Sequence, residues 1–117
     1  MISFVKLFAQ SNPQYIRIAK LVIDSAKLQS YNAAPKEHAE TAVKVEPGVL
    51  MLYAVAEKEN PTHVSVFEIY ANLDEYKSHI RTSHFLKYKK TVEGMVKSLS
   101  LVDIEPIALE AKQKLSN

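Results

Sequence analysis

Residues 48–71, GVLMLYAVAEKENPTHVSVFEIYA, contain two apolar stretches separated by a polar turn, and this pattern decides the fold. Val49–Glu57 and His63–Ala71 are rich in the β-branched and aromatic residues that favour strands. Between them, Lys58–Thr62 contains Asn-Pro, a typical turn-forming pair. We therefore expect two neighbouring strands that pair as an antiparallel hairpin.

Both predicted strands carry apolar side chains on both faces. A sheet with one face in water normally alternates apolar and polar residues, and LMLYAVA and VSVFEIYA do not. Helices would cover one face, and the simplest cover for the other face is a second copy of the chain. The sequence therefore predicts a homodimer in which sheet packs on sheet.

The segments before the hairpin predict one strand and one helix. Tyr15–Asp24 is aliphatic and β-branched, which is typical of a strand. From Leu28 to Val45, apolar positions recur at steps of three and four, as on one face of a helix. Pro35 should kink or interrupt this helix, and Glu46-Pro47-Gly48 should end it.

The segments after the hairpin predict a helix in two pieces and a last strand. Asn72 followed by Glu75 can cap a helix start, and Thr82-Ser83 can form a joint where the helix restarts. The second piece should carry an apolar stripe from Phe85 to Leu99. The final strand is predicted over residues 99–107 and should stop at Pro106.

The order strand, helix, strand, strand, helix, strand predicts an α+β fold. It is the ferredoxin-like βαββαβ arrangement, a four-stranded antiparallel sheet with two helices on one face. At 117 residues, the chain is long enough for one domain. We assign residues 15–107 to this domain, residues 1–14 to an N-terminal arm and residues 108–117 to a polar C-terminal tail.

Composition excludes several classes of function. Fifteen basic and thirteen acidic residues leave a formal charge of +2, too little to attract nucleic acid. No apolar run reaches the roughly 20 residues of a membrane-spanning helix. We therefore expect no membrane partner and a cytoplasmic location. A longer leader before Met1 is the alternative. The chain has no cysteine, so a metal would need His and carboxylate ligands.

Three parts of the sequence resemble the antibiotic biosynthesis monooxygenase (ABM) domain family. They are Glu46-Pro47-Gly48, Glu68 with Tyr70, and His79 with the run Thr82–Phe85, and the resemblance extends over residues 15–107. It implies a dimeric α+β barrel that oxygenates a phenol, quinol or polyketide-like aromatic molecule, without a cofactor, in a pocket between sheet and helices.

The haem-degrading branch of the family also resembles the chain. That branch has a Trp where Tyr70 stands and a His near Lys89, and this chain has neither. The resemblance therefore argues against haem as a substrate.

His79 and His84 are a doubtful metal pair. Five positions on one helix place them about 140° apart around its axis, and no acidic residue nearby in sequence offers a third ligand. We therefore predict no metal. His84 either closes the helix joint or takes a proton from a substrate at the pocket mouth. His79 either flanks the packed helix face or contacts the substrate.

The other candidate site residues each have a structural and a functional interpretation. His38 lies on the apolar stripe of the first helix, either as a core residue or as a general base with a pKa lowered by burial. Glu68 and Tyr70 share one strand face. Glu68, Tyr70 and Tyr53 are either structural or bind an aromatic substrate.

Two functions are consistent with these observations. The first is a cofactor-independent monooxygenase with His38 or His84 as the base and with Tyr53, Glu68, Tyr70 and His79 binding the substrate. The second is a dimeric protein of the same fold that binds a small molecule without converting it, because the sequence has no unmistakable catalytic motif.

Overall fold

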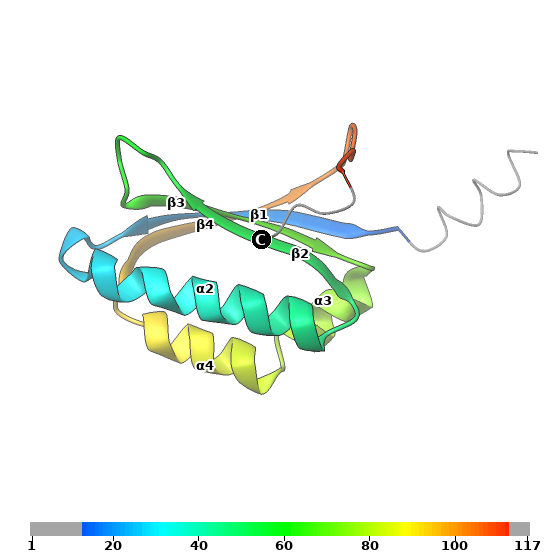
Figure 1. Cartoon of the computed structure of the whole chain (residues 1–117), viewed down its shortest axis with the longest axis horizontal. Helices are drawn as coiled ribbons and strands as arrows, with labels where there is room; N and C mark the ends of the chain where they lie inside the picture. The colour runs from blue at the N-terminus through cyan, green and yellow to red at the C-terminus, as the bar shows by residue number, and fades with distance from the viewer. Residues whose placement is uncertain (1–12, 113–117) are drawn as a thin grey trace, which may run out of the picture.

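The computed structural model describes residues 13–112, in which helices cover one side of a four-stranded antiparallel sheet (Figure 1). The sheet has the order β2-β3-β1-β4. The strands are β1 (Tyr15–Ile23), β2 (Val49–Ala56), β3 (His63–Tyr70) and β4 (Val96–Ile104). The helical elements are the 3₁₀ turn η1 (Ser25–Lys27), α2 (Leu28–Val45), α3 (Leu73–His79) and α4 (Ser83–Val92). The predicted ferredoxin-like α+β fold is confirmed.

The hairpin of β2 and β3 forms as the sequence predicts. The two strands pair antiparallel from Val49 opposite Tyr70 to Ala56 opposite Val64. β3 also pairs with β1, which lies between β3 and β4. Most of the predicted N-terminal arm and the end of the predicted tail lie outside the described residues, and residues 108–112 form no helix.

Pro35 does not interrupt the first helix, so this part of the prediction was wrong. α2 is continuous from Leu28 to Val45 with Pro35 inside it. Proline removes one backbone hydrogen bond from a helix. Pro35 and Tyr31 are buried, and burial of apolar surface is favourable enough to compensate for a lost hydrogen bond.

The last helix is shorter than the apolar stripe predicted. α4 ends at Val92, and Val96 and Leu99 belong to β4. Gly94 has a φ of 83°, a left-handed conformation that suits glycine and turns the chain into the strand. β4 therefore begins at Val96 rather than at Leu99. It ends at Ile104, before Pro106.

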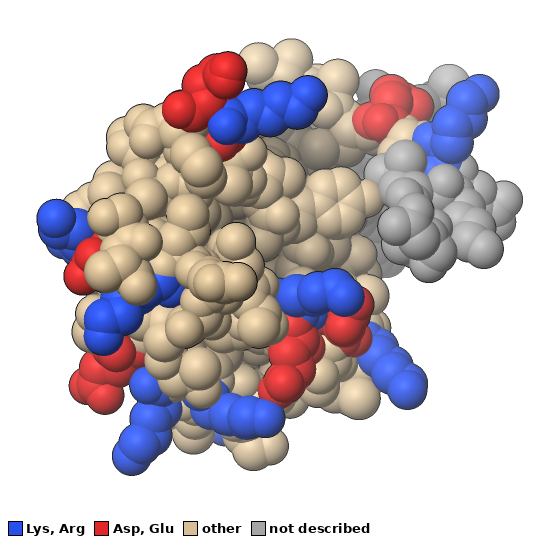
Figure 2. Space-filling model, turned by 60° about the vertical axis from the view of Figure 1, so that its left-hand side comes forward, with Lys and Arg blue, Asp and Glu red and all other residues tan. Residues whose placement is uncertain are grey.

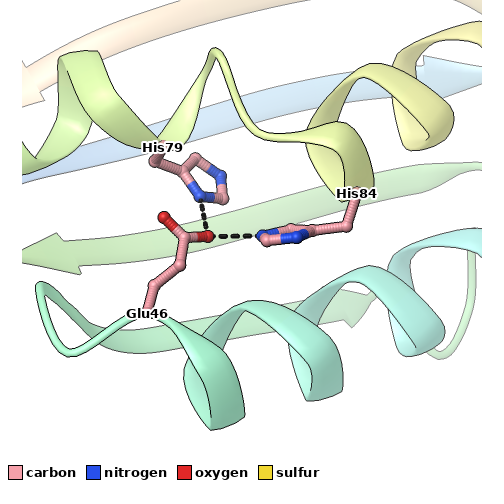
Figure 3. Close-up of side chains that lie close together, drawn as sticks. All are labelled: Glu46, His79 and His84. Carbon is pink, nitrogen blue, oxygen red and sulfur yellow. Dashed lines mark hydrogen bonds and ion pairs between the residues drawn. The ribbon is translucent and has the colours of Figure 1, made fainter.

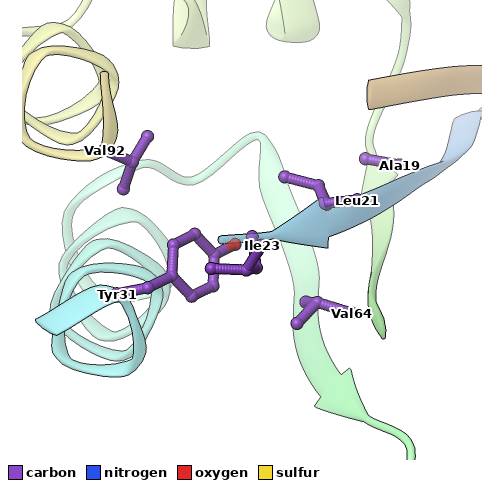
Figure 4. Packing of buried hydrophobic residues seen from close by; sticks show 6 residues of the cluster. All are labelled: Ala19, Leu21, Ile23, Tyr31, Val64 and Val92. Carbon is purple, nitrogen blue, oxygen red and sulfur yellow. The ribbon is translucent and has the colours of Figure 1, made fainter. Parts of the chain in front are cut away.

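One core cluster joins α2 and α4 to the centre of the sheet (Figure 4). Ile23 and Tyr31 are almost fully buried, and Leu21, Val64 and Val92 pack around them. Each large apolar side chain buried in this way contributes about 1.5–3 kcal/mol. The sheet side of the cluster comes from alternate residues of β1 and from Val64 of β3. The same alternation places Ala19 and Arg17 on one face of β1.

The opposite face of the sheet is apolar and partly exposed. Tyr53 and Val55 alternate along β2 with Leu52 and Ala54, which face the helices, and they are 40% and 60% exposed. Val102 on β4 is likewise 40% exposed. In the view of Figure 2, acidic and basic side chains are interspersed around a surface of residues without formal charge and do not form a patch of one sign. Within residues 13–112, no helix is long and apolar enough to span a membrane.

The predicted cap at Asn72 forms, and Thr82 caps α4 at the predicted joint Thr82-Ser83. The Asn72 side chain accepts a hydrogen bond from the backbone N–H of Glu75 at 2.9 Å. The Thr82 hydroxyl accepts one from the N–H of Phe85 at 3.2 Å, at the start of α4. The Thr82 cap lies between α3 and α4, so His79 and His84 are on different helices.

We expect Asn72→Ala to lower the free energy of unfolding by about 1 kcal/mol, because it removes the cap of α3. Asn72→Asp keeps an acceptor at the same position and should leave stability within a few tenths of a kcal/mol. Urea denaturation of the two variants and the wild type measures this difference. Equal stability of the alanine and aspartate variants would contradict the role of the cap.

Candidate functional site

A cavity of about 760 Å³ lies between the sheet and the helices. This volume is within the range of about 300–1,000 Å³ that is typical of small-molecule sites. Most of its wall is apolar, with contributions from all four strands and from α2 and α4, including Ala19, Leu21, Leu52, Ala54, Val66 and Phe85. This volume would accommodate an aromatic molecule of a few rings in contact with these apolar side chains.

Glu46, His79 and His84 converge at one end of the helical layer (Figure 3). Glu46 caps the C-terminus of α2, His79 ends α3, and His84 lies in the first turn of α4. One oxygen of Glu46, Oε2, lies 2.8 Å from Nδ1 of His79 and 2.5 Å from Nε2 of His84. Because a carboxylate accepts hydrogen bonds, both imidazoles donate to it.

This hydrogen bonding sets the tautomer of His79. With its proton on Nδ1, the ring has Nε2 as an acceptor. His79 is 2% exposed overall, and it lines the cavity. A histidine held by a carboxylate through one nitrogen can accept a proton with the other, as in catalytic triads.

His38 lies beside this pair, in the middle of α2. Its ring stacks on Tyr88 with centroids 4.7 Å apart, and it lies 5.1 Å from the ring of His79 and 5.8 Å from that of His84. Its Nδ1 is buried and has no hydrogen-bond partner among the described residues. Burial, with a smaller effect of the two nearby histidines, lowers the pKa of His38 to about 4. At neutral pH the ring is therefore uncharged.

The sheet contributes a second polar group to the cavity. Arg17 on β1 and Glu68 on β3 are buried and line the cavity, with 3.5 Å between Nη2 of the arginine and Oε1 of the glutamate. The hydroxyl of Tyr70 donates to the same Oε1 at 2.6 Å. Nη1 of Arg17 donates to the hydroxyl of Tyr76 at 2.7 Å. Burial and the Glu68 carboxylate raise the pKa of Tyr70, so this hydroxyl keeps its proton.

The structure brings most of the predicted site residues together. His38, His79 and Glu68 line the cavity. His84 lines a smaller recess of about 150 Å³ that also includes His38. Tyr70 is fully buried and contacts Glu68 rather than the cavity. Tyr53 alone is separate, because it lies on the exposed face of the sheet opposite the helices.

Three residues that form part of the candidate site were not identified as site residues from the sequence. Glu46 was interpreted only as part of a helix stop, although a carboxylate there can reach a later helix start. Arg17 had a usable signal, since a charged residue in an otherwise apolar strand shares a face with Ala19 and Leu21. Tyr76 had none, because aromatic residues on a helix are ordinarily core residues.

Glu46, His79 and His84 could in principle also hold a metal ion. Their ligand atoms lie within 4.8 Å of one another, and two imidazoles with a carboxylate form a known zinc ligand set. The expectation that no acidic residue would join the histidines was therefore wrong. Ligands of tetrahedral zinc stand about 3.4 Å apart. The observed 2.8 and 2.5 Å are hydrogen-bond distances, so direct hydrogen bonding accounts for the cluster.

Comparisons with known proteins agree on one family. A family model described as antibiotic biosynthesis monooxygenase matches residues 14–91. A solved structure from Bacteroides thetaiotaomicron, provisionally named an antibiotic biosynthesis monooxygenase, is 48% identical, with a TM-score of 0.82 over 86% of this chain and 96% of that one. No curated protein matches the sequence significantly.

Two further structures extend the similarity to more distant relatives. A provisionally named monooxygenase from Lactobacillus acidophilus is 28% identical, with a TM-score of 0.74 over 77% of this chain and 43% of that one. A Nitrosomonas europaea structure with a provisional name in the same family is 20% identical, with a TM-score of 0.76 over 82% of this chain and 92% of that one. This last similarity shows the fold alone.

We expect protonation of His38 to destabilise the fold in acid. Between about pH 6.5 and pH 4 the unfolded chain binds a proton at His38 that the folded chain does not. Stability should therefore fall as the pH falls through this range, by about 1–2 kcal/mol after allowance for the partly exposed ring. His38→Gln should reduce this pH dependence, which urea denaturation at a series of pH values would measure. An unchanged slope in the variant would contradict the assignment.

Proposed function

We infer that this chain, which belongs to the antibiotic biosynthesis monooxygenase family, is a monooxygenase that acts on a small phenol or quinol bound in the cavity. The observation that carries the proposal is the position of His79. It is a buried imidazole on the wall of an apolar cavity, held by Glu46 through Nδ1. Such an arrangement supports proton transfer from a substrate in surroundings that exclude water.

In the proposed reaction, the substrate supplies the electrons and the protein removes a proton. His79 accepts the proton at Nε2, while Glu46 fixes the ring and balances its charge. The substrate ring, once ionised, is electron-rich and reacts with O₂. A CH₂ group of the keto tautomer and O₂ give a C=O group and one water, so that no external reductant is needed. We therefore propose that the reaction proceeds without a cofactor.

The other histidines support this step in different ways. His84 donates a hydrogen bond to the same oxygen of Glu46 and is a positioning residue. His38 is uncharged at neutral pH and offers a flat ring on the cavity wall beside Tyr88. Its low pKa makes it a weaker base, which favours His79 over His38 for proton removal.

We expect His79→Gln to lower O₂-dependent turnover about 100-fold or more, the usual contribution of a general base. Oxygen uptake with a panel of simple quinols, phenols and anthrone-type compounds measures it. His63→Gln is the matched control. His63 lies at the start of β3, where its partly exposed side chain is near Glu57, and it does not line the cavity. Its turnover should equal that of the wild type.

The same experiment separates catalysis from binding alone. A ligand that binds the folded state raises its melting temperature. Saturable stabilisation by members of the panel without oxygen uptake would reject the monooxygenase. It would favour the alternative, a protein of the same fold that binds a small aromatic molecule without converting it.

We also propose that two copies pack through the exposed faces of their sheets. The support is the apolar face formed by Tyr53, Val55 and Val102, which are 40–60% exposed. Large exposed apolar surfaces commonly mark contact sites. Such packing would also close the sheet side of the molecule against solvent.

We expect Val55→Glu to convert the dimer into a monomer, because a charge buried between two sheets costs several kcal/mol. Val43→Glu on α2 is the control, since Val43 has a comparable exposure of 46% but lies on a helix. Light scattering after gel filtration gives the mass of each protein. A monomeric wild type, or a dimeric Val55→Glu variant, would contradict this interface.

A further inference from the structure

Arg17 is a buried cation on the wall of an otherwise apolar cavity. It lies in the middle of β1 and is 9% exposed, and its neighbours on the same strand face, Ala19 and Leu21, are apolar. Burying a charge costs several kcal/mol unless the charge is well compensated. The structure therefore raises the question of what compensates this guanidinium.

The described residues use only part of the hydrogen-bonding capacity of Arg17. A guanidinium has five N–H donors. Nη1 donates to Tyr76 at 2.7 Å, and Nη2 makes a long contact of 3.5 Å with Glu68. Nε is buried and has no partner among the described residues. The ring of Tyr76 lies 4.5 Å from the guanidinium carbon and holds it in place from one side.

The nearby carboxylates neutralise Arg17 only loosely. Oε1 of Glu68 accepts a hydrogen bond of 2.6 Å from the hydroxyl of Tyr70, which is shorter than its contact of 3.5 Å with Arg17. Asp103 pairs with Arg17 in the register of β1 and β4, but its carboxylate accepts from the hydroxyl of Tyr15 at 2.7 Å and makes no ion pair with Arg17. A tight charge-assisted bond would be about 2.7–2.9 Å long. The guanidinium therefore retains capacity for another acceptor.

The residues that line the cavity carry a small excess of positive charge. Three cationic side chains line it against two carboxylates, since Lys89 and Lys90 join Arg17 and Glu93 joins Glu68. The lysines are exposed, on α4, and can attract an anion toward the cavity. Inside, Arg17 is the one cationic side chain that is buried. A ligand with an apolar ring and one negative oxygen matches this distribution.

We propose that Arg17 binds the ionised oxygen of a phenolic ring, so that the ligand is held in the cavity as the phenolate. The ring would lie among the apolar side chains, and the guanidinium would stabilise the negative oxygen in surroundings of low polarity. That the ligand is also a substrate rests on the proposed function. If it is, Arg17 holds the ring in the electron-rich form that reacts with O₂.

4-Nitrophenol tests this directly, because it absorbs visible light only when ionised. The wild type should bind it and lower its apparent pKa, so that its visible absorbance appears at a lower pH than in the free phenol. The test variant is Arg17→Met combined with Glu68→Gln, which avoids leaving a buried carboxylate unpaired. We expect it to bind the phenolate at least about tenfold more weakly and to lose the pKa shift.

Two controls separate charge recognition from shape. Glu68→Gln alone keeps Arg17 and should bind the phenolate at least as tightly as the wild type. 4-Nitroanisole has a similar ring but no ionisable oxygen, and calorimetry should show equal binding to the wild type and the double variant. Circular dichroism and thermal melting confirm that each variant is folded.

Several outcomes would overturn the proposal. They are no binding of 4-nitrophenol to the wild type, equal binding to the double variant, or an equal loss of 4-nitroanisole binding. If the loss of Arg17 weakened the binding of 4-nitrobenzoate more than the binding of 4-nitrophenol, the proposal would also be overturned, in favour of carboxylate recognition. Phenolate binding that depends on Arg17, without oxygen uptake by any phenol, would support the anion site and reject the monooxygenase.

Discussion

A single carboxylate oxygen joins helices α2, α3 and α4 at one point. Glu46 receives hydrogen bonds from His79 at the end of α3 and from His84 at the start of α4. A negative charge at the C-terminus of α2 is unfavourable because of the helix dipole, so the two imidazole donors also stabilise Glu46 where it stands. The chain must break between α3 and α4 for both rings to reach it, and the cap at Thr82 provides that break.

The two sides of the cavity have different chemical characters as a result. The helices contribute uncharged or carboxylate-bound imidazoles, whereas the sheet contributes a guanidinium with a glutamate and a tyrosine beside it. Apolar side chains separate the two groups. In such surroundings, hydrogen bonds and charges act more strongly than in water. Proton removal from the helical side and anion stabilisation from the sheet side are therefore compatible in one bound molecule.

Local pattern was sufficient to predict most of the fold and part of the site. The hairpin, the first strand, the first helix and the joint at Thr82 all depend on neighbours within a few residues, and each formed where predicted. The end of α4 was predicted too late, because one glycine with a positive φ outweighs a continuing apolar stripe. His38 and Glu68 were found since each is polar in an apolar pattern, and both line the cavity.

The sequence by itself determined which face of each helix is apolar and that the strands of the hairpin are apolar on both faces, and hence the layers of the molecule. That information is local, because side-chain direction follows the period of the helix or strand. Only the tertiary structure decided that Glu46 lies between two histidines more than thirty positions away, and that Arg17 meets Glu68 across neighbouring strands. Such contacts depend on strand register and on how the helix ends pack, which no short stretch of sequence specifies.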